Sequence, residues 1–508
     1  MADLVCTLSP PCGVLSSAPF HSMDVGNLVE IVIIICRSML VVLRYSPSIR
    51  RLVRRLPIPT AIDMSKTLGL KPWEACALPG KEKSPTDNSL ISIPGPGHLR
   101  VVINDVDSAF ELLEKPNFSD RPQWPMARLL GRDQNVGFLQ YGKRLQQSRR
   151  ILAGSFNRGV VTKHWKGLIE SHSTELVRCL LSSPEDFFED VQTEVKRMII
   201  ELTYGDMPNR EYISRVNKVQ HEISAVIQPT RIWLVNIIPE RLVWLLPSSI
   251  NRFLRWTREM RIIYQQLIQS SFDRAKVQAR PSFVTSCLVS NPTVPEDVVL
   301  SAAGSLLSAG TETMEAFILT FIALLHDRPD IQERAFSEIS SVVGLGRLPG
   351  LQDYDALPYI NCIIQEVHRY HPVVPLVTHS NRSEENCIGW RIPKKSWVFA
   401  NVWAMLHDGR IYSKPNEFSP DRFMPRHGES TLRDPRDLVF GFGRRVCPGR
   451  HLANSFLFLV VTRVVALLKI VPRDNQAPIE WQNALVSAPH GFQCGFEARE
   501  HVTISSFV

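Results

Sequence analysis

The residues with the clearest capacity for chemistry form a glycine-punctuated loop near the C-terminal end of the chain. Five of them follow the spacing Phe-x-x-Gly-x-Arg-x-Cys-x-Gly, namely Phe440, Gly443, Arg445, Cys447 and Gly449. The two glycines permit backbone angles that side chains forbid, which would let the chain approach a flat ligand, and Arg445 offers cationic donors to an anion. An apolar run at helical spacing follows over residues 452–468, and the start of a helix favours thiolate over thiol. We therefore expect Cys447 to be a thiolate ligand for a transition metal with an open coordination side.

A second pattern lies within the apolar stretch 298–325, where the sequence reads Ala-Gly-Thr-Glu-Thr from Ala309 to Thr313. A glycine inside a helix lowers the stability of the helix by about 1 kcal/mol relative to alanine, so the presence of Gly310 indicates a packing or functional role. Without a side chain at this position, the backbone could lie against a planar cofactor. Thr313 can donate to the carbonyl of Ala309, one turn earlier, and bend the helix. Glu312 and Thr313 then offer an acid and a hydroxyl in an apolar run, a pairing that suits proton delivery.

A third pattern is an amphipathic helix over residues 357–369. Glu366 and Arg369 are three positions apart, so they share a helix face and can pair. On a surface such a pair contributes little to stability.

The cysteine pattern resembles the haem-binding signature of cytochrome P450, a family of haem-thiolate monooxygenases. The resemblance extends over residues 93–497 and includes the three patterns in the family's order. It implies that Cys447 is the axial iron ligand of haem b. The cysteine sulfur donates electron density to the iron, which favours O–O cleavage. It also implies that Ala309 and Gly310 lie against the haem and that Glu312 and Thr313 are catalytic. A lone cysteine in such a loop is more often a buried structural thiol, but the five positions together favour the ligand.

The resemblance further assigns a buried scaffold. In the family the Glu-x-x-Arg pair is buried and is completed by a second arginine, for which Arg422 is the match. Two guanidiniums can clamp one carboxylate through forked contacts, so Glu366, Arg369 and Arg422 are expected to be structural residues.

Contacts with the haem propionates and the substrate are also implied by resemblance. Arg149 occupies the position of a propionate-binding arginine, although Leu145 stands where relatives carry tryptophan, and His379 is expected to hydrogen-bond a propionate. The alternatives are a basic surface helix for Arg149 and an ordinary core or surface histidine for His379. Three segments are expected to face substrate: residues 124–138, 373–377 and, by a looser match, 484–486.

The composition is that of an ordinary globular protein, with 44% hydrophobic and 21% charged residues. The net charge of +8 fits a membrane surface or an acidic partner, and no dense basic run interleaved with aromatics indicates nucleic-acid binding. The ten cysteines are scattered without a C-x-x-C pair, which indicates neither a zinc site nor a disulfide scaffold. Free thiols in a reducing compartment are the expectation.

The N-terminal part suggests a membrane anchor. Residues 28–43 are mostly apolar, and a cluster of arginines follows with no acidic residue until Asp63, as in an anchor with its basic flank in the cytosol. Glu30 and Arg37 interrupt the run, so a buried or interfacial amphipathic helix is the alternative. We expect an anchor and basic flank over 1–55, an irregular linker over 56–89 and the catalytic domain over 90–508. The apolar residues of 229–247 are either a second attachment point or core.

The expected fold is α+β and mainly helical, with a small β-rich lobe. The expected activity is monooxygenation of an apolar small molecule with O2 and electrons from NADPH-cytochrome P450 reductase, at the endoplasmic reticulum membrane. The sequence most resembles fungal members that tailor secondary metabolites, which favours a terpenoid substrate and then an aromatic or indolic one. A haem-thiolate isomerase or peroxygenase is the alternative enzyme, and Glu312 with Thr313 argues against it. A non-catalytic haem sensor is the alternative of another class.

Overall fold

The computed structural model describes residues 71–77, 90–95, 98–227, 248–278, 280–387, 389–425, 432–473, 479–482 and 484–500. The predicted anchor over 1–55 and the apolar segment 229–247 lie outside these ranges, as does the predicted linker except for residues 71–77.

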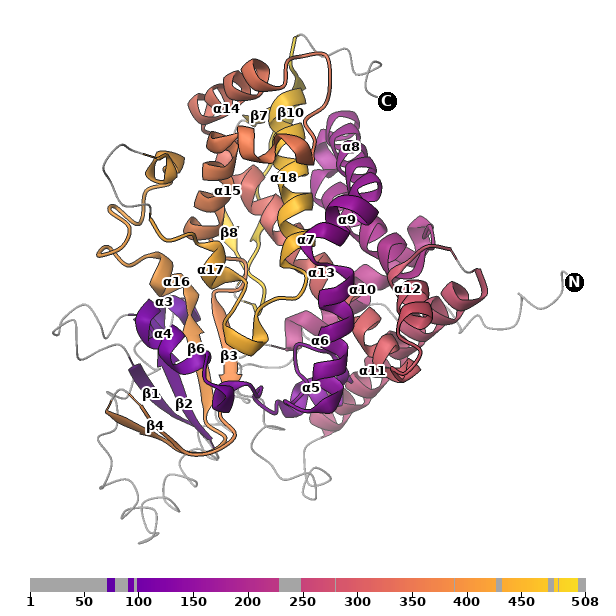
Figure 1. The fold of residues 1–508 in the computed structure, drawn as a ribbon, viewed down its shortest axis with the longest axis vertical. Coiled ribbons are helices and arrows are strands. Elements are labelled where there is room, and N and C mark those ends of the chain that lie inside the picture. The colour runs from indigo at the N-terminus through magenta and orange to yellow at the C-terminus, as the bar shows by residue number, and fades with distance from the viewer. Residues whose placement is uncertain are drawn as a thin grey trace, which may run out of the picture. The chain divides into compact units, whose positions relative to one another are not determined.

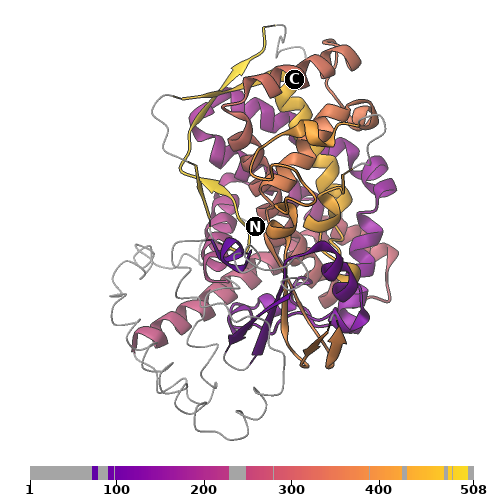
Figure 2. The same ribbon diagram turned by 90° about the vertical axis from the view of Figure 1, so that its left-hand side faces the viewer.

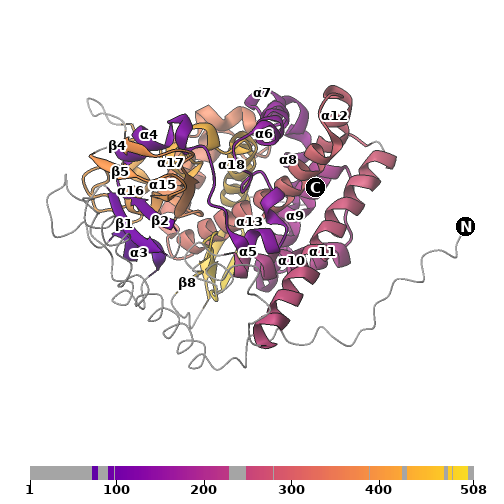
Figure 3. The same cartoon turned by 90° about the horizontal axis from the view of Figure 1, so that it is seen from below.

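The helices form the larger part of the described chain (Figure 1). Their bounds are α5 (Pro125–Leu129), α6 (Lys143–Ser155), α8 (Lys166–Ser182), α9 (Phe187–Tyr204), α10 (Arg210–Val226), α11 (Ser248–Gln278), α12 (Phe283–Ser290), α13 (Glu296–Leu325), α14 (Pro329–Val342), α15 (Pro358–Tyr370) and α18 (Arg450–Leu467). Helix α13 packs against α6, α9, α11, α12, α15 and α18, and Figure 3 shows the long helix α11 at one side of the helices. The apolar stretch around Ala309–Thr313 is therefore the central helix of the fold.

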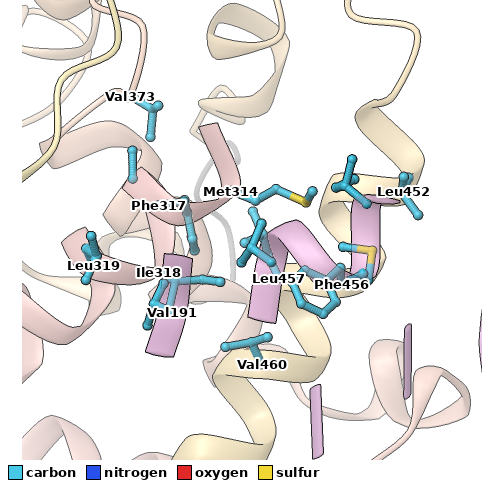
Figure 4. Close-up of a cluster of buried hydrophobic side chains, with 14 of the residues drawn as sticks. Val191, Met314, Phe317, Ile318, Leu319, Val373, Leu452, Phe456, Leu457 and Val460 are labelled. Carbon is cyan, nitrogen blue, oxygen red and sulfur yellow. The ribbon is translucent and has the colours of Figure 1, made fainter. Parts of the chain in front are cut away.

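Helices α13 and α18 are also long and apolar enough to cross a membrane, but 72% of the most apolar window of each is buried within the protein. Their apolar character is that of core helices. Figure 4 shows the contact: Leu457 and Phe456 of α18 lie toward Met314, Phe317 and Ile318 of α13. The helix that follows Cys447 and the helix that carries Thr313 thus belong to one hydrophobic core.

The β-rich lobe is a four-stranded sheet in the order β1 (Leu90–Gly95), β2 (His98–Ile103), β6 (Trp397–Asn401) and β3 (Leu376–Ser380). Strands β1 and β2 form an antiparallel hairpin, β2 pairs parallel with β6, and β6 pairs antiparallel with β3. Figure 2 shows this sheet below the helices. The prediction of a mainly helical α+β fold with a small β-rich lobe is confirmed.

Smaller elements complete the fold. They are α4 (Val106–Leu113), capped by the Asp105 side chain, and the two-stranded pairs β4 (Glu385–Cys387) with β5 (Trp390–Ile392), β7 (Leu468–Pro472) with β10 (Cys494–Ala498), and β8 (Glu480–Trp481) with β9 (Pro489–His490).

The prediction of irregular backbone throughout 56–89 is wrong at α3 (Pro72–Ala77). Trp73 is buried to 2% exposure, and its carbonyl accepts a hydrogen bond of 2.9 Å from Asn401. The carbonyl of Cys76 accepts one of 3.0 Å from Asn104. These contacts come from residues distant in sequence, which is why the local pattern of this polar segment did not indicate a helix.

A buried cationic histidine joins α8 to α9. Nδ1 of His172 lies 2.5 Å from Glu194 and Nε2 lies 2.9 Å from Glu201. Burial alone would lower the pKa of His172, but hydrogen bonds and charge from the two carboxylates outweigh it and raise the pKa to about 9.

We expect the free energy of unfolding to fall in alkaline solution for this reason. The folded-state pKa of His172 lies above its ordinary value of 6.5, so the contribution is complete below pH 6.5 and is lost as the pH rises through about 9. The shift corresponds to a loss on the order of 3 kcal/mol. Urea unfolding at about pH 6 and about pH 10 should show this loss in the unsubstituted protein and a smaller one in His172→Gln. An equal pH dependence in both proteins would contradict the assignment.

Candidate active site

The cysteine loop connects α17 (Arg436–Val439) to α18 through the short helix η12 (Gly443–Arg445). The backbone N–H of Cys447 donates to the Phe440 carbonyl at 2.7 Å, and the Phe440 ring lies 5.8 Å from that of His368. Burial raises the pKa of the Cys447 thiol, although the Gly449 N–H, Arg149 and Arg450 act in the opposite direction. Burial thus opposes the groups at the start of α18 that favour thiolate, and a bound metal cation would favour the thiolate by taking the place of the proton.

The two glycines of the cysteine loop, Gly443 and Gly449, have different backbone conformations. Gly443 has a φ of +50°, and a Cβ there would lie 2.5 Å from the Leu113 carbonyl oxygen, so glycine is required by close packing against α4. Gly449 has a φ of −91°, which any residue adopts. At Gly443 the fold itself thus requires glycine, and the approach of both glycines to a flat ligand stays a prediction.

The acid and the hydroxyl predicted on α13 border one cavity of about 250 Å³. Thr313 donates to the Ala309 carbonyl at 2.8 Å, which is the predicted bond one turn back. Glu312 accepts a hydrogen bond of 2.7 Å from Ser224 of α10, and burial raises the pKa of its carboxyl. The threonine oxygen keeps two lone pairs and can still accept from water.

Gly310 lies on another side of α13. A Cβ at this position would lie 3.0 Å from Cδ1 of Ile199, so the missing side chain serves the packing of α13 on α9. Ala309, which is exposed, lines the cavity instead. Helix packing therefore gives a reason for glycine at position 310, and its place against a planar cofactor stays a prediction.

Apolar side chains from distant parts of the chain form much of the rest of the cavity wall. They come from the three segments expected to face substrate, and include Trp124, Phe138, Val374, Leu376, Val377, Leu485 and Val486. The structure brings these segments together around Ala309 and Thr313.

Three guanidiniums gather beside the cysteine loop. Arg445 is 5% exposed and donates to the carbonyls of Ser119 and Leu139 at 2.5 and 2.6 Å. Arg149 donates to the Val446 carbonyl at 2.7 Å, and Arg121 to that of Gly137 at 3.0 Å.

Each of these cations is held without an anion. Burial, together with the charges of Arg445 and Arg149, lowers the pKa of Arg121 well below its ordinary value, and burial with Arg149 lowers the pKa of Arg445 to about 10. In the part of the chain that the structure describes, no carboxylate lies within 4.0 Å of any of the three. Repelling cations without a counter-ion, of which Arg445 is buried and Arg121 and Arg149 are half-buried, indicate a site for an anionic group.

His379 adjoins this cluster. It is fully buried, its Nδ1 lies 2.8 Å from the Phe118 carbonyl, and its Nε2 has no hydrogen-bond partner among the residues that the structure describes. Burial and the charge of Arg121 lower its pKa, so the ring is neutral. Because Nδ1 carries the proton that it donates to the Phe118 carbonyl, Nε2 carries only a lone pair. Nε2 can therefore donate to a carboxylate only if the ring gains a second proton.

Sequence reasoning missed Arg121. The only available signal was a basic residue directly before Pro122 at the opening of a loop, and nothing in that pattern indicates burial. Leu145, which stands where a tryptophan was expected, is buried to 1% exposure and is core.

The predicted ion pair behind the site is present and fully buried. Arg369 donates to Glu366 through Nε and Nη2 at 2.7 and 2.8 Å, and Arg422 donates through Nε at 3.1 Å. Glu366 and Arg369 are 0% exposed, and the Ser419 N–H adds a fourth donor at 2.7 Å. The three side chains tie α15 to the turn η11 (Pro420–Phe423).

A second, more polar cavity of about 860 Å³ lies behind Glu312. It shares Ser224, Glu312 and Val486 with the first cavity, and its wall includes the buried ion pair between Lys196 and Glu315. Glu312 therefore borders both a largely apolar and a polar space.

No other metal site is present among the described residues, where no group of three or more His, Cys, Asp or Glu side chains could hold a metal ion. The seven cysteines of this part of the chain carry free thiols. One cysteine in a loop before a core helix, an acid with a hydroxyl on the facing core helix, and a buried cationic cluster define the class of thiolate-ligated cofactor enzymes.

Comparison with known proteins places the chain more closely. A sequence profile of the family described as Cytochrome P450 matches residues 89–496. Cytochrome P450 monooxygenase 208 of Postia placenta is 30% identical over 81% of this chain and 83% of its own length, and Cytochrome P450 monooxygenase COX1 of Coprinopsis cinerea is 30% identical over 87% and 90%. A zebra fish cytochrome P450 solved with progesterone has a TM-score of 0.72 at 23% identity, covering 85% of this chain and all of that one.

The chain belongs to the cytochrome P450 family and is a monooxygenase. Family membership implies a haem-thiolate cofactor, O2 as a substrate and a redox partner that supplies electrons.

Proposed function

We propose that this monooxygenase hydroxylates or epoxidises an apolar terpenoid in a secondary-metabolite pathway. The observation that carries the proposal is the cavity that Ala309 and Thr313 border, because most of its wall is apolar and Glu312 supplies an acid beside it. The fungal relatives at 30% identity support a role in small-molecule metabolism. An aromatic or indolic substrate is the second candidate, since Trp124 and Phe138 offer aromatic faces in the same wall.

The residues present fit the haem that the family implies. Cys447 would bind the iron, and Arg121, Arg149 and Arg445 would hold the two propionates, which would supply the anions that these cations lack. His379 would join them only as a cation. Haem b, when bound, supplies reductive activation of O2 and insertion of one oxygen atom into a C–H bond or a double bond.

The part of the reaction that falls to the protein is binding and proton delivery. Apolar walls hold the substrate and exclude bulk water from it. Glu312 borders the polar cavity on one side and the largely apolar cavity on the other, so it can take up a proton from the wetter side. Thr313, fixed by its bond to Ala309, can hold the water through which that proton reaches the reduced oxygen.

The electron donor in this proposal is NADPH-cytochrome P450 reductase, and the location is the endoplasmic reticulum membrane with the catalytic domain in the cytosol. The apolar run 28–43 with its following arginines supports attachment. The net charge of +8 favours contact with an acidic partner or an anionic lipid surface.

The test is turnover by the full chain reconstituted with the reductase in lipid vesicles. Given NADPH, O2 and either a sesquiterpene hydrocarbon or indole, we expect a product with one added oxygen atom from the sesquiterpene. Product from indole alone would move the substrate class to the second candidate. Haem reduction without product from either compound would support the non-catalytic sensor, and product formed with peroxide but not with NADPH would support the peroxygenase.

A further inference from the structure

The substrate cavity contains a buried arginine that the site described above does not use. Arg132, in the short helix η5 (Arg132–Gln134) between α5 and α6, is 4% exposed and lines the cavity. Its side chain has no hydrogen-bond or ion-pair partner among the described residues, and Nη1 is buried without one. Arg121, which lines the same cavity, differs in that it donates to backbone carbonyls.

The surroundings of Arg132 compensate its charge only in part. The guanidinium carbon lies 4.0 Å from the centre of the Tyr264 ring, an attractive contact but a weaker one than a carboxylate offers. Glu312 is near enough for Arg132 to lower its pKa, yet it lies beyond ion-pairing distance and its Oε1 accepts from Ser224. The neighbouring Asp133 accepts from Gln134 through Oδ2 and makes no ion pair with Arg132.

A buried guanidinium without an anion is costly, and it is stabilised when a ligand brings one. The fork of N–H donors on arginine matches a carboxylate in two parallel bonds. Nδ2 of Asn135 donates a hydrogen bond of 3.1 Å to Oγ of Ser308. Both side chains lie in the wall of the same cavity and offer further polar contacts.

We propose that Arg132 binds a carboxylate of the substrate, so that the natural substrate is an apolar carboxylic acid. This inference rests on the proposed function and narrows it from a terpenoid to a terpenoid acid. An acid anchored at η5 would extend its apolar part along Ala309 and Thr313. The oxygen atom would then be inserted at a carbon remote from the acid group.

The test measures binding to the holoenzyme by calorimetry, with two matched pairs of probes: geranic acid with methyl geranate, and decanoic acid with methyl decanoate. Haem content and the thiolate absorption band are recorded first, so that loss of the cofactor site is separated from loss of acid binding. We expect each acid to bind at least about 10-fold more tightly than its ester. Arg132→Gln should weaken acid binding by about 30-fold or more, with ester binding changed by less than about 3-fold.

Two further variants keep the result interpretable. Arg132→Lys retains the charge and should keep part of the preference for acid, which also guards against a Gln variant that folds poorly. Arg215→Gln removes an exposed arginine of α10 that does not line the cavity, and it should leave both affinities unchanged. Equal binding of acid and ester by the unsubstituted enzyme would overturn the proposal, and so would an equal loss of acid and ester binding in Arg132→Gln. A preference for acid with the decanoate pair alone would support the carboxylate site and contradict the terpenoid class.

Discussion

Replacing Thr313 by alanine is expected to lower the amount of product formed per NADPH consumed by about 10²–10⁴-fold, the range for loss of a positioned proton donor. The hydroxyl is held by its bond to the Ala309 carbonyl and borders the same cavity as Glu312. Without this hydroxyl, no side chain at position 313 orders the water that delivers the proton. The reduced oxygen is then released as hydrogen peroxide instead of entering the substrate. Substrate binding and NADPH oxidation should be nearly intact, so product and peroxide are to be assayed in one mixture.

The matched control is Thr320→Ala. Thr320 lies on the same helix and donates to the Ala316 carbonyl in the same way, but it is fully buried and does not line the cavity. Thr313→Ser should restore much of the product yield, because it keeps the hydroxyl. If Thr313→Ala forms as much product per NADPH as Thr320→Ala does, Thr313 is only a helix residue and the proton arrives by another route.

The second large effect is expected from Glu366→Gln. The substitution keeps the shape of the side chain but leaves two guanidiniums, those of Arg369 and Arg422, beside each other without their carboxylate. Breaking a fully buried pair in this way costs about 3–5 kcal/mol. We expect a loss of that size in the free energy of unfolding and a large drop in the yield of haem-containing protein.

Glu384→Gln is the control for this prediction. Glu384 pairs with Arg391 at 2.8 Å, but the two side chains are 45% and 53% exposed, and solvent screens such a pair. The same substitution should change the free energy of unfolding far less there. An equally small effect at Glu366 would show that the triad contributes no more than a surface ion pair.

The sequence could predict contacts between residues that are close together along the chain, because the spacing on a helix determines which side chains meet. The bond from Thr313 to Ala309 follows from a spacing of four on a helix, and the contact between Glu366 and Arg369 follows from a spacing of three. The contact of Arg422 with Glu366 needed a resemblance to a known family, since the two are far apart in sequence. Each of these could be stated before the fold was known.

The sequence could not predict contacts that depend on tertiary packing between distant parts of the chain. The close approach of Ile199 of α9 to Gly310 is an example, because glycine by its type suggests close approach but does not say which neighbour approaches. Arg121 precedes α5 and Arg132 lies in η5, and the basic character of neither residue indicates that its side chain lines a cavity, which only the folded chain shows. The α3 helix forms for the same reason, through Asn104 and Asn401.

The central claim, that Cys447 supplies the thiolate ligand of the haem, is tested most directly by the absorption spectrum of the reduced protein under carbon monoxide. We expect the unsubstituted protein to show the red-shifted Soret band of thiolate ligation, because the sulfur donates electron density to the iron. Cys447→His should retain haem but lose that band, whereas Cys179→Ser, at a half-buried cysteine of α8, should keep it. A red-shifted band that persists unchanged in Cys447→His would contradict the account.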